Sequence, residues 1–358
     1  MPDFDAAAFA NTRKILAAFQ KHRVSDSHFA PSTGYGYNDP GRDVLDAVFA
    51  DIMGTEDAIV RAAFAGGTHA IACALKAACP DGGYWSLTGE PYDTLRGIMP
   101  YRVADGWTGE PPPAFFIQRS RGYSDRKALS VADVNALIAK ARAFSDAPIV
   151  VDNCYCEFVE TEEPSNADLI AGSLIKNPGG GLATMGGYIA GRRDLVDKAA
   201  WQLNAVGRDC GANPSGSRLL FQGLMTAPHT VAQALKTAAF AAEELQRLGY
   251  AVDPLPDEER YDIIQAVHFG APEPLLRFAR GIQRGSPVDS FAVPEPWDMP
   301  GYEHQVVMAA GTFVQGASIE LSCDAPMRPP YTAYLQGGLT FELGKLGVTQ
   351  AIQALCGS

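Results

Sequence analysis

The hydrophobic and polar positions follow two kinds of spacing along the first two thirds of the chain. Apolar residues recur at helical spacing in four segments, 6–23, 44–53, 131–144 and 218–248. Short apolar runs typical of buried strands lie at 114–117, 148–151, 168–173 and 187–191. Strands separated by helix-length segments predict an α/β fold with a parallel or mixed sheet between two layers of helices. In such sheets, ligands bind beyond the carboxyl ends of the strands.

The pattern changes in the last third of the chain. Strands are expected at 250–256 and 262–269, a helix is expected at 273–283, and glycine and proline crowd the segment 294–302. This change predicts three parts. They are an N-terminal helix and arm (1–45), a large domain (46–221) and a smaller α+β domain (222–358).

Composition and charge narrow the class of protein. Of the 358 residues, 47% are hydrophobic and 20% are charged, which is typical of a globular protein. The net charge of −12 argues against nucleic acid or an anionic membrane as a partner. The start of the chain lacks the pattern of a signal peptide, and no apolar run approaches the roughly 20 residues of a membrane helix. Seven cysteines, an odd number, favour a reducing cytoplasm over a disulfide framework. Cys154 and Cys156 lack a second cluster of ligands, so no metal site is expected.

Two charged residues stand at the ends of predicted strands. Asp152 ends an apolar strand, where a carboxylate needs a positive partner such as the protonated pyridine nitrogen of pyridoxal 5′-phosphate (PLP). A helix N-cap or a structural ion pair is the alternative. Lys176 follows the next strand, where burial would lower its pKa and make the amine nucleophilic toward an aldehyde. A lysine that extends to the surface is the alternative there.

Two further segments suit a phosphate group. Ser173 lies just before Lys176, and the glycines 179–181 allow close approach of the backbone. Gly66 and Gly67 lead directly into a predicted helix, whose first N–H groups are free to bind an anion. An ordinary junction between loop and helix explains these two glycines equally well.

Taken in order, these motifs resemble those of the fold-type-I PLP enzymes, and more narrowly the methionine γ-lyase-like or "aluminium resistance" family. The segments that carry the resemblance are Gly66-Gly67-Thr68-His69, Pro91-Tyr92-Asp93-Thr94, Val151-Asp152-Asn153 and Ser173-Leu174-Ile175-Lys176-Asn177-Pro178-Gly179-Gly180-Gly181. The resemblance extends over nearly the whole chain. It implies a large, mostly parallel, seven-stranded sheet domain and a smaller α+β C-terminal domain.

The resemblance also implies roles for individual residues around the cofactor. Lys176 would hold PLP as a Schiff base and move protons at Cα, while Asp152 would pair with the pyridine nitrogen. Tyr92 would stack on the ring and assist departure of the leaving group; a buried core tyrosine is the alternative. The phosphate would be held by Gly66, Gly67, Thr68 and Ser173.

Other implied roles concern the substrate and a second subunit. Tyr35 or Tyr37, with Arg42, would reach the phosphate of the neighbouring subunit, which implies a homodimer with shared active sites, either alone or paired into a tetramer. Arg328 would clamp the α-carboxylate of an amino-acid substrate, since an arginine can bind a carboxylate with two nitrogens.

The implied reaction is elimination of a group from Cγ, or from Cβ, of an L-amino acid, with cleavage of a carbon–sulfur bond. Arg208 departs from the usual family pattern, which indicates either an altered substrate at the mouth of the site or drift in a surface loop. Elimination of chloride from 4-chloro-allyl-L-glycine, which yields the terminal alkyne L-propargylglycine, is therefore an alternative. An aminotransferase and a PLP-binding protein without catalysis are further alternatives.

Overall fold

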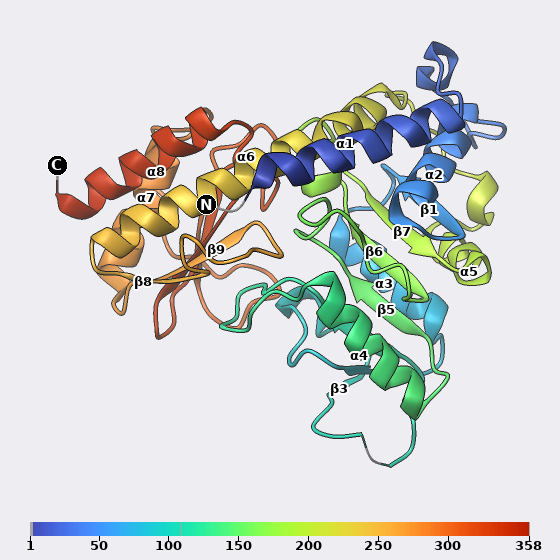
Figure 1. Ribbon diagram of the computed structural model, residues 1–358, viewed down its shortest axis with the longest axis horizontal. Coiled ribbons are helices and arrows are strands. Elements are labelled where there is room, and N and C mark those ends of the chain that lie inside the picture. Colours follow the sequence, from blue (N-terminus) through green and yellow to red (C-terminus); the bar gives the residue numbers. More distant parts are fainter. Residues whose placement is uncertain (1–2, 108, 358) are drawn as a thin grey trace.

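The computed structural model describes residues 3–107 and 109–357 and has two lobes (Figure 1). A long helix, α6 (Arg218–Arg247), runs through both lobes, and α1 (Phe4–Lys21) packs along it. Both helices lie where the apolar spacing predicts them. Among the described residues, no helix combines the length and the apolar character that a membrane crossing requires.

The larger lobe is built on a seven-stranded sheet. From one edge to the other its strands are β1 (Asp57–Arg61), β7 (Gly187–Gly191), β6 (Leu169–Ser173), β5 (Ile149–Asp152), β4 (Phe115–Gln118), β2 (Tyr84–Ser86) and β3 (Tyr101–Val103). Strands β3, β2, β4, β5 and β6 are parallel, and β7 is antiparallel to both of its neighbours. The predicted α/β fold with a large, mostly parallel sheet is thus confirmed. The apolar pattern did not reveal β1, β2 and β3.

Helices pack around this sheet. They are α2 (Pro40–Met53), α3 (Gly67–Ala78), α4 (Val131–Phe144) and α5 (Arg193–Leu203). Local chemistry sets where they begin: the side chain of Asp39 caps α2 ahead of Pro40, so this helix starts four residues before its apolar pattern does. Ser130 and Asp133 form a capping box at the start of α4, which has the bounds that the sequence predicts.

The smaller lobe holds a five-stranded antiparallel sheet. Its strands, in order, are β10 (Val306–Ala309), β11 (Ser322–Pro326), β12 (Thr332–Gln336), β9 (Ile264–His268) and β8 (Ala251–Asp253). Helices α7 (Pro272–Arg284) and α8 (Phe341–Cys356) pack together beside it. The predicted boundary at residue 222 falls within α6. The first turns of this helix belong to the core of the large lobe and its last turns to the core of the small lobe.

Candidate active site

A small cavity lies at the carboxyl ends of the parallel strands β4, β5 and β6. Adjacent parallel strands end at the same edge of a sheet, so residues far apart in sequence meet there. The cavity brings together four of the predicted site residues, Thr68, Tyr92, Asp152 and Lys176. The other residues that line it are Ile71, Leu95, Gln118, Ser120, Gly122, Cys154 and Tyr155.

Lys176 lies three residues beyond β6, in an acidic environment. Its Nζ is 4.2 Å from the ring centre of Tyr155, a residue held at a positive φ of 71°. Burial alone lowers the pKa of the ammonium group, but nearby acidic groups, those of Cys154, Tyr155 and Asp152, outweigh burial and raise the pKa above its usual value. The expected lowering of the Lys176 pKa is therefore wrong, because the apolar sequence around the lysine does not reveal these neighbours.

Asp152 is the last residue of β5 and is 5% exposed. One carboxylate oxygen accepts a hydrogen bond from the backbone N–H of Cys154 at 3.0 Å. Burial raises the pKa of Asp152, although this hydrogen bond and Lys176 act in the opposite direction. Within the described part of the chain, no lysine, arginine or histidine forms an ion pair with Asp152. A buried carboxylate that lines a cavity without such a partner suits a protonated pyridine nitrogen.

The start of α3 and the end of β6 together form a further polar part of the site. Gly66 precedes α3 and provides no side-chain cap, so the first N–H groups of the helix are available to an anion. The Ser173 hydroxyl is buried and has no hydrogen-bond partner among the described residues. A Cβ atom at Gly67 would lie 3.0 Å from Cβ of Ser173 and 3.1 Å from Sγ of Cys154, so a larger residue would crowd this part of the site. The four predicted phosphate-binding residues thus converge, and the residues present fit PLP.

Tyr92 reaches the cavity from the loop after β2. Its backbone N–H donates to Oε1 of Gln118 at 2.9 Å, and its hydroxyl contacts the hydroxyl of Tyr302. Burial raises the pKa of the Tyr92 hydroxyl well above its usual value, so the group keeps its proton. The ring of Tyr123 lies 5.3 Å from that of Tyr92 and edge-on to it.

Sequence reasoning did not single out Tyr123, Tyr302 or Asp324. These residues lie in three segments that are distant in sequence, and they share no motif that could have identified them. Their proximity arises only from packing of the small lobe against the loop that follows β4.

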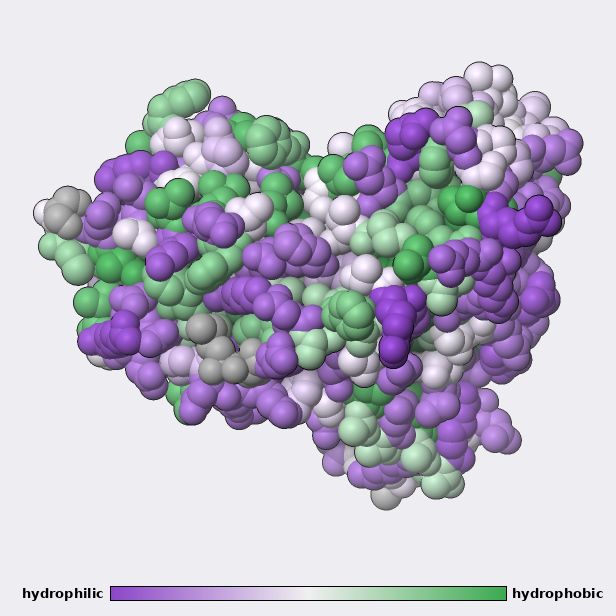
Figure 2. Space-filling view, turned by 45° about the horizontal axis from the view of Figure 1, so that its top comes forward, coloured by the Kyte–Doolittle hydropathy of each residue, from purple (hydrophilic) through white to green (hydrophobic). Residues whose placement is uncertain are grey.

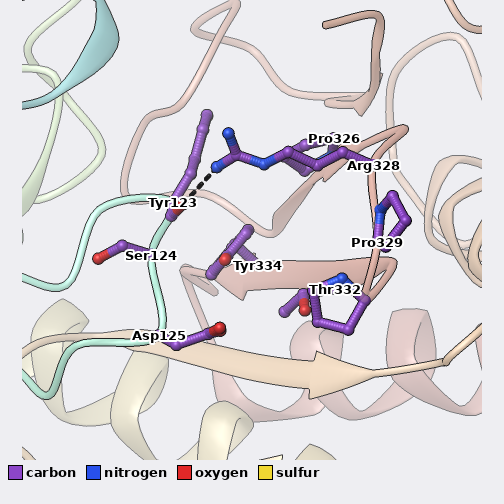
Figure 3. A pocket seen from close by; sticks show the side chains of 9 residues that line it. Tyr123, Ser124, Asp125, Pro326, Arg328, Pro329, Thr332 and Tyr334 are labelled. Atoms are coloured by element: carbon purple, nitrogen blue, oxygen red, sulfur yellow. Dashed lines mark hydrogen bonds between the residues drawn. The ribbon is translucent and has the colours of Figure 1, made fainter.

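Arg328 lies in a separate cavity, shown in Figure 3. This cavity is lined by Tyr123, Ser124, Asp125, Pro326, Arg328, Pro329, Pro330, Thr332 and Tyr334. The guanidinium group points toward Tyr123 and donates to its carbonyl oxygen at 3.0 Å. Ser120 and Gly122 line the Lys176 cavity and residues 123–125 line this one, so the two cavities are neighbours. The structure nevertheless does not bring Arg328 to the cavity that contains Lys176.

The arm and Arg208 also lie away from the Lys176 cavity of their own chain. Tyr35 and Tyr37 are exposed, and their rings stack on each other at 5.4 Å. Arg42 is buried and supports the arm, because its guanidinium donates to the carbonyl oxygen of Gly36 at 2.9 Å. Arg208, expected at the mouth of the site, instead binds another residue, the carboxylate of Asp57 at the start of β1, through two nitrogens at 2.9 and 3.0 Å.

Comparison with known proteins agrees with this geometry. The model of the methionine gamma-lyase family matches residues 1–107 and 113–356. A candidate cystathionine beta-lyase involved in aluminum resistance from Listeria monocytogenes is 44% identical with a TM-score of 0.94, and the match covers 98% of this chain and 95% of that one. A carbon–sulfur lyase involved in aluminum resistance from Clostridium novyi is 42% identical with a TM-score of 0.89, covering 98% and 90% of the two chains.

A more distant structure shares the fold alone. This is a methionine gamma lyase from Micromonospora echinospora, CalE6, which is 17% identical with a TM-score of 0.67 over 96% of this chain and 99% of that one. With an architecture typical of fold-type-I PLP enzymes and a family match over nearly its whole length, the chain belongs to the methionine gamma-lyase family.

Proposed function

We propose that the protein is a PLP-dependent lyase that cleaves a carbon–sulfur bond by elimination from Cγ, or from Cβ, of an L-amino acid. The observation that carries this proposal is the convergence of Asp152, Lys176, Ser173 and the start of α3 on one corner of the sheet. Each of these groups matches one part of the cofactor in chemistry, and the relative from Clostridium novyi is described as a carbon–sulfur lyase. When bound, PLP withdraws electrons from Cα of the amino acid and so makes its proton acidic.

The chain's own groups would hold the cofactor at its two polar ends. Asp152 would accept a hydrogen bond from the pyridine N–H, since the carboxylate is buried and forms no ion pair with the described residues. The Ser173 hydroxyl and the N–H groups of Gly67 and Thr68 would bind the phosphate.

Lys176 would carry the cofactor and act as the base at Cα. The acidic neighbours that raise the pKa of its amino group also make the free amine a stronger proton acceptor. Nζ would take the Cα proton and move it toward the side chain of the substrate. The Tyr155 ring beneath Nζ limits where the amine can swing.

Tyr92 would donate a proton to the departing sulfur. Its hydroxyl keeps its proton at neutral pH because of burial, and it lines the same cavity as Lys176. An alkanethiolate is a poor leaving group, so a proton donor at this place accelerates the cleavage.

We also propose that the protein works as a homodimer with shared sites on a small-molecule amino acid. Apolar side chains gather on part of the right-hand lobe in Figure 2. Around the arm, Tyr35, Tyr37, Met185 and Leu219 are all exposed, and the backbone N–H of Gly211 binds the carbonyl of Tyr35 at 2.9 Å. Such exposed apolar surface is typical of an interface. Light scattering would distinguish a monomer, which contradicts the proposal, from a dimer or a tetramer.

Mixing two inactive proteins would test whether a site is shared. Lys176→Ala lacks the cofactor lysine, and the double variant Tyr35→Ala/Tyr37→Ala lacks the exposed aromatic pair. Activity should return in mixed dimers, because one of their two sites has every residue intact. Two proteins that stay inactive after mixing, while exchanging subunits, would contradict sharing.

The reaction itself is tested by product analysis. We expect the purified protein to absorb at about 420 nm, and to release a 2-oxo acid, ammonia and a sulfur product from methionine, homocysteine or cystathionine; the sulfur product is a thiol, or hydrogen sulfide in the case of homocysteine. Lys176→Ala should lose both the absorption and the products. Chloride release from 4-chloro-allyl-L-glycine alone would favour the alkyne-forming reaction, and formation of pyridoxamine phosphate would favour an aminotransferase. Absorption without any of these products would leave a PLP-binding protein that is not a lyase.

A further inference from the structure

A cluster of tyrosines and one aspartate lies where the two lobes meet at the active site. Tyr92 and Tyr123 come from the large lobe, and Tyr302 and Asp324 come from the last 60 residues or so of the chain. The ring of Tyr123 lies 5.3 Å from that of Tyr92 and 5.8 Å from that of Tyr302. A fourth ring, that of Tyr334, stacks on Tyr123 from the small-lobe side at 5.3 Å.

Asp324 is a fully buried carboxylate in β11. One of its oxygens, Oδ2, accepts the hydroxyl of Tyr123, with Gln336 Nε2 at 3.4 Å from the same atom. Its other oxygen, Oδ1, is buried and has no hydrogen-bond partner among the described residues. No ion pair joins Asp324 to a cation within 3–107 and 109–357. A buried carboxylate with so few partners costs folding energy, which is typical of a residue kept for function.

The ionisation state of Asp324 determines which group donates the hydrogen bond between Asp324 and Tyr123. Burial raises the pKa of Asp324 to about 6, so the carboxylate is still ionised at neutral pH and can only accept. The Tyr123 hydroxyl must therefore donate to Asp324, which fixes the orientation of the Tyr123 side chain. The ring of Tyr123, held by this hydrogen bond, lies against the rings of Tyr92 and Tyr302, whose hydroxyls contact each other.

We propose that Asp324 is a positioning residue for Tyr92: it fixes Tyr123 by a hydrogen bond, and the ring of Tyr123 packs edge-on against that of Tyr92. This inference rests on the proposed lyase function and names the groups that prepare its proton donor. In the step concerned, the carbon–sulfur bond breaks, the electron pair leaves with sulfur, and the sulfur takes the proton of the Tyr92 hydroxyl. Tyr92 then regains a proton from Tyr302, which is partly exposed and can be reprotonated by water.

The test compares leaving groups that differ in their need for a proton. Asp324→Asn and Tyr123→Phe each remove one end of the contact and keep the shape of the side chain. In the holoenzyme, both variants should slow thiol release from a γ-thioether amino acid by about tenfold or more. Release of chloride from the matching γ-chloro amino acid should change less than about threefold, because chloride leaves without a proton.

Three measurements separate positioning from general damage. The affinity of the apoprotein for PLP, measured by fluorescence titration, should stay within about threefold of wild type in both variants. Neither residue is among those expected to bind the phosphate or the pyridine nitrogen. Tyr84→Phe, which removes a buried hydroxyl without a partner among the described residues, is the matched control and should leave both rates unchanged. The double variant Tyr123→Phe/Asp324→Asn should be no slower than the slower single variant, because the two residues act as one unit.

The outcomes distinguish this inference from the proposed function. Equal slowing of thiol and chloride release, independent effects in the double variant, or unchanged thiol release in Asp324→Asn would each overturn the positioning role. Tyr123→Phe keeps the test valid if Asp324→Asn does not fold. A wild-type protein that binds PLP but releases neither thiol nor chloride would overturn the proposed function, and this inference with it.

Discussion

Glu157 carries a buried carboxyl group whose titration should be measurable as a change in stability with pH. It is fully buried behind the active site, where the Tyr188 hydroxyl donates to Oε1 at 2.8 Å. The other oxygen, Oε2, has no hydrogen-bond partner among the described residues. Burial raises the pKa of Glu157 from 4.5 to about 8, with Glu163 acting in the same direction, so the group is protonated at neutral pH in the folded protein.

The sign and size of the effect follow from linkage. Between pH 5 and pH 8 the folded protein keeps this proton while the unfolded chain has lost it, so rising pH favours unfolding. Each pH unit in that interval costs about 1.4 kcal/mol, which amounts to about 4 kcal/mol over three units. The stability due to this group is therefore fully present below the unfolded pKa of 4.5 and is lost as the pH approaches 8.

Glu157→Gln should remove this dependence. We expect the free energy of unfolding of the wild-type apoprotein to fall by about 4 kcal/mol more than that of the variant between pH 5 and pH 8. Guanidinium unfolding followed by tryptophan fluorescence at pH 5, 6.5 and 8 measures both proteins. A constant offset from the new amide cancels, because only the change with pH is compared.

A matched control lies in the same segment. Glu162 is exposed, so Glu162→Gln should follow the wild-type stability at every pH. If the free energy of unfolding of Glu157→Gln also changed with pH as that of the wild type does, within about 1 kcal/mol, the Glu157 carboxyl would be ionised in the folded state. That result would refute the reasoning from burial.

Three further substitutions test the site. Ser173→Ala should weaken PLP binding to the apoprotein about tenfold without lowering the unfolding midpoint, because this buried hydroxyl has no protein partner among the described residues. Gly67→Ala should weaken PLP binding further, since its Cβ would lie 3.0 Å from Ser173 and 3.1 Å from Cys154; unchanged affinity in a PLP titration would contradict this. Arg208→Met should cost about 1–2 kcal/mol of stability, because it removes the ion pair with Asp57. It should leave kcat/KM unchanged, and a changed substrate preference would instead show that Arg208 acts at the active site.

Much of the candidate site follows from the sequence by itself. Asp152 and Lys176 each follow an apolar run that forms a buried strand, and the polar residue that ends such a run marks the edge of the sheet. Gly66 and Gly67 mark the start of a helix because glycine leaves the first N–H groups uncovered. These signals are local, and periodicity reports local structure and burial faithfully.

The tertiary structure alone decided the rest. Tyr123, Tyr302 and Asp324 come together only because the small lobe packs against the large one, and residues in three distant segments leave no common pattern in the sequence. The raised pKa of Lys176 depends on acidic groups that packing brings around it, whereas its apolar sequence neighbours alone predict a lowered value. The sequence could not predict the position of Arg208 for the same reason, since its ion pair with Asp57 joins residues 151 positions apart. Charge interactions depend on distance in space, which the order of residues along the chain does not specify.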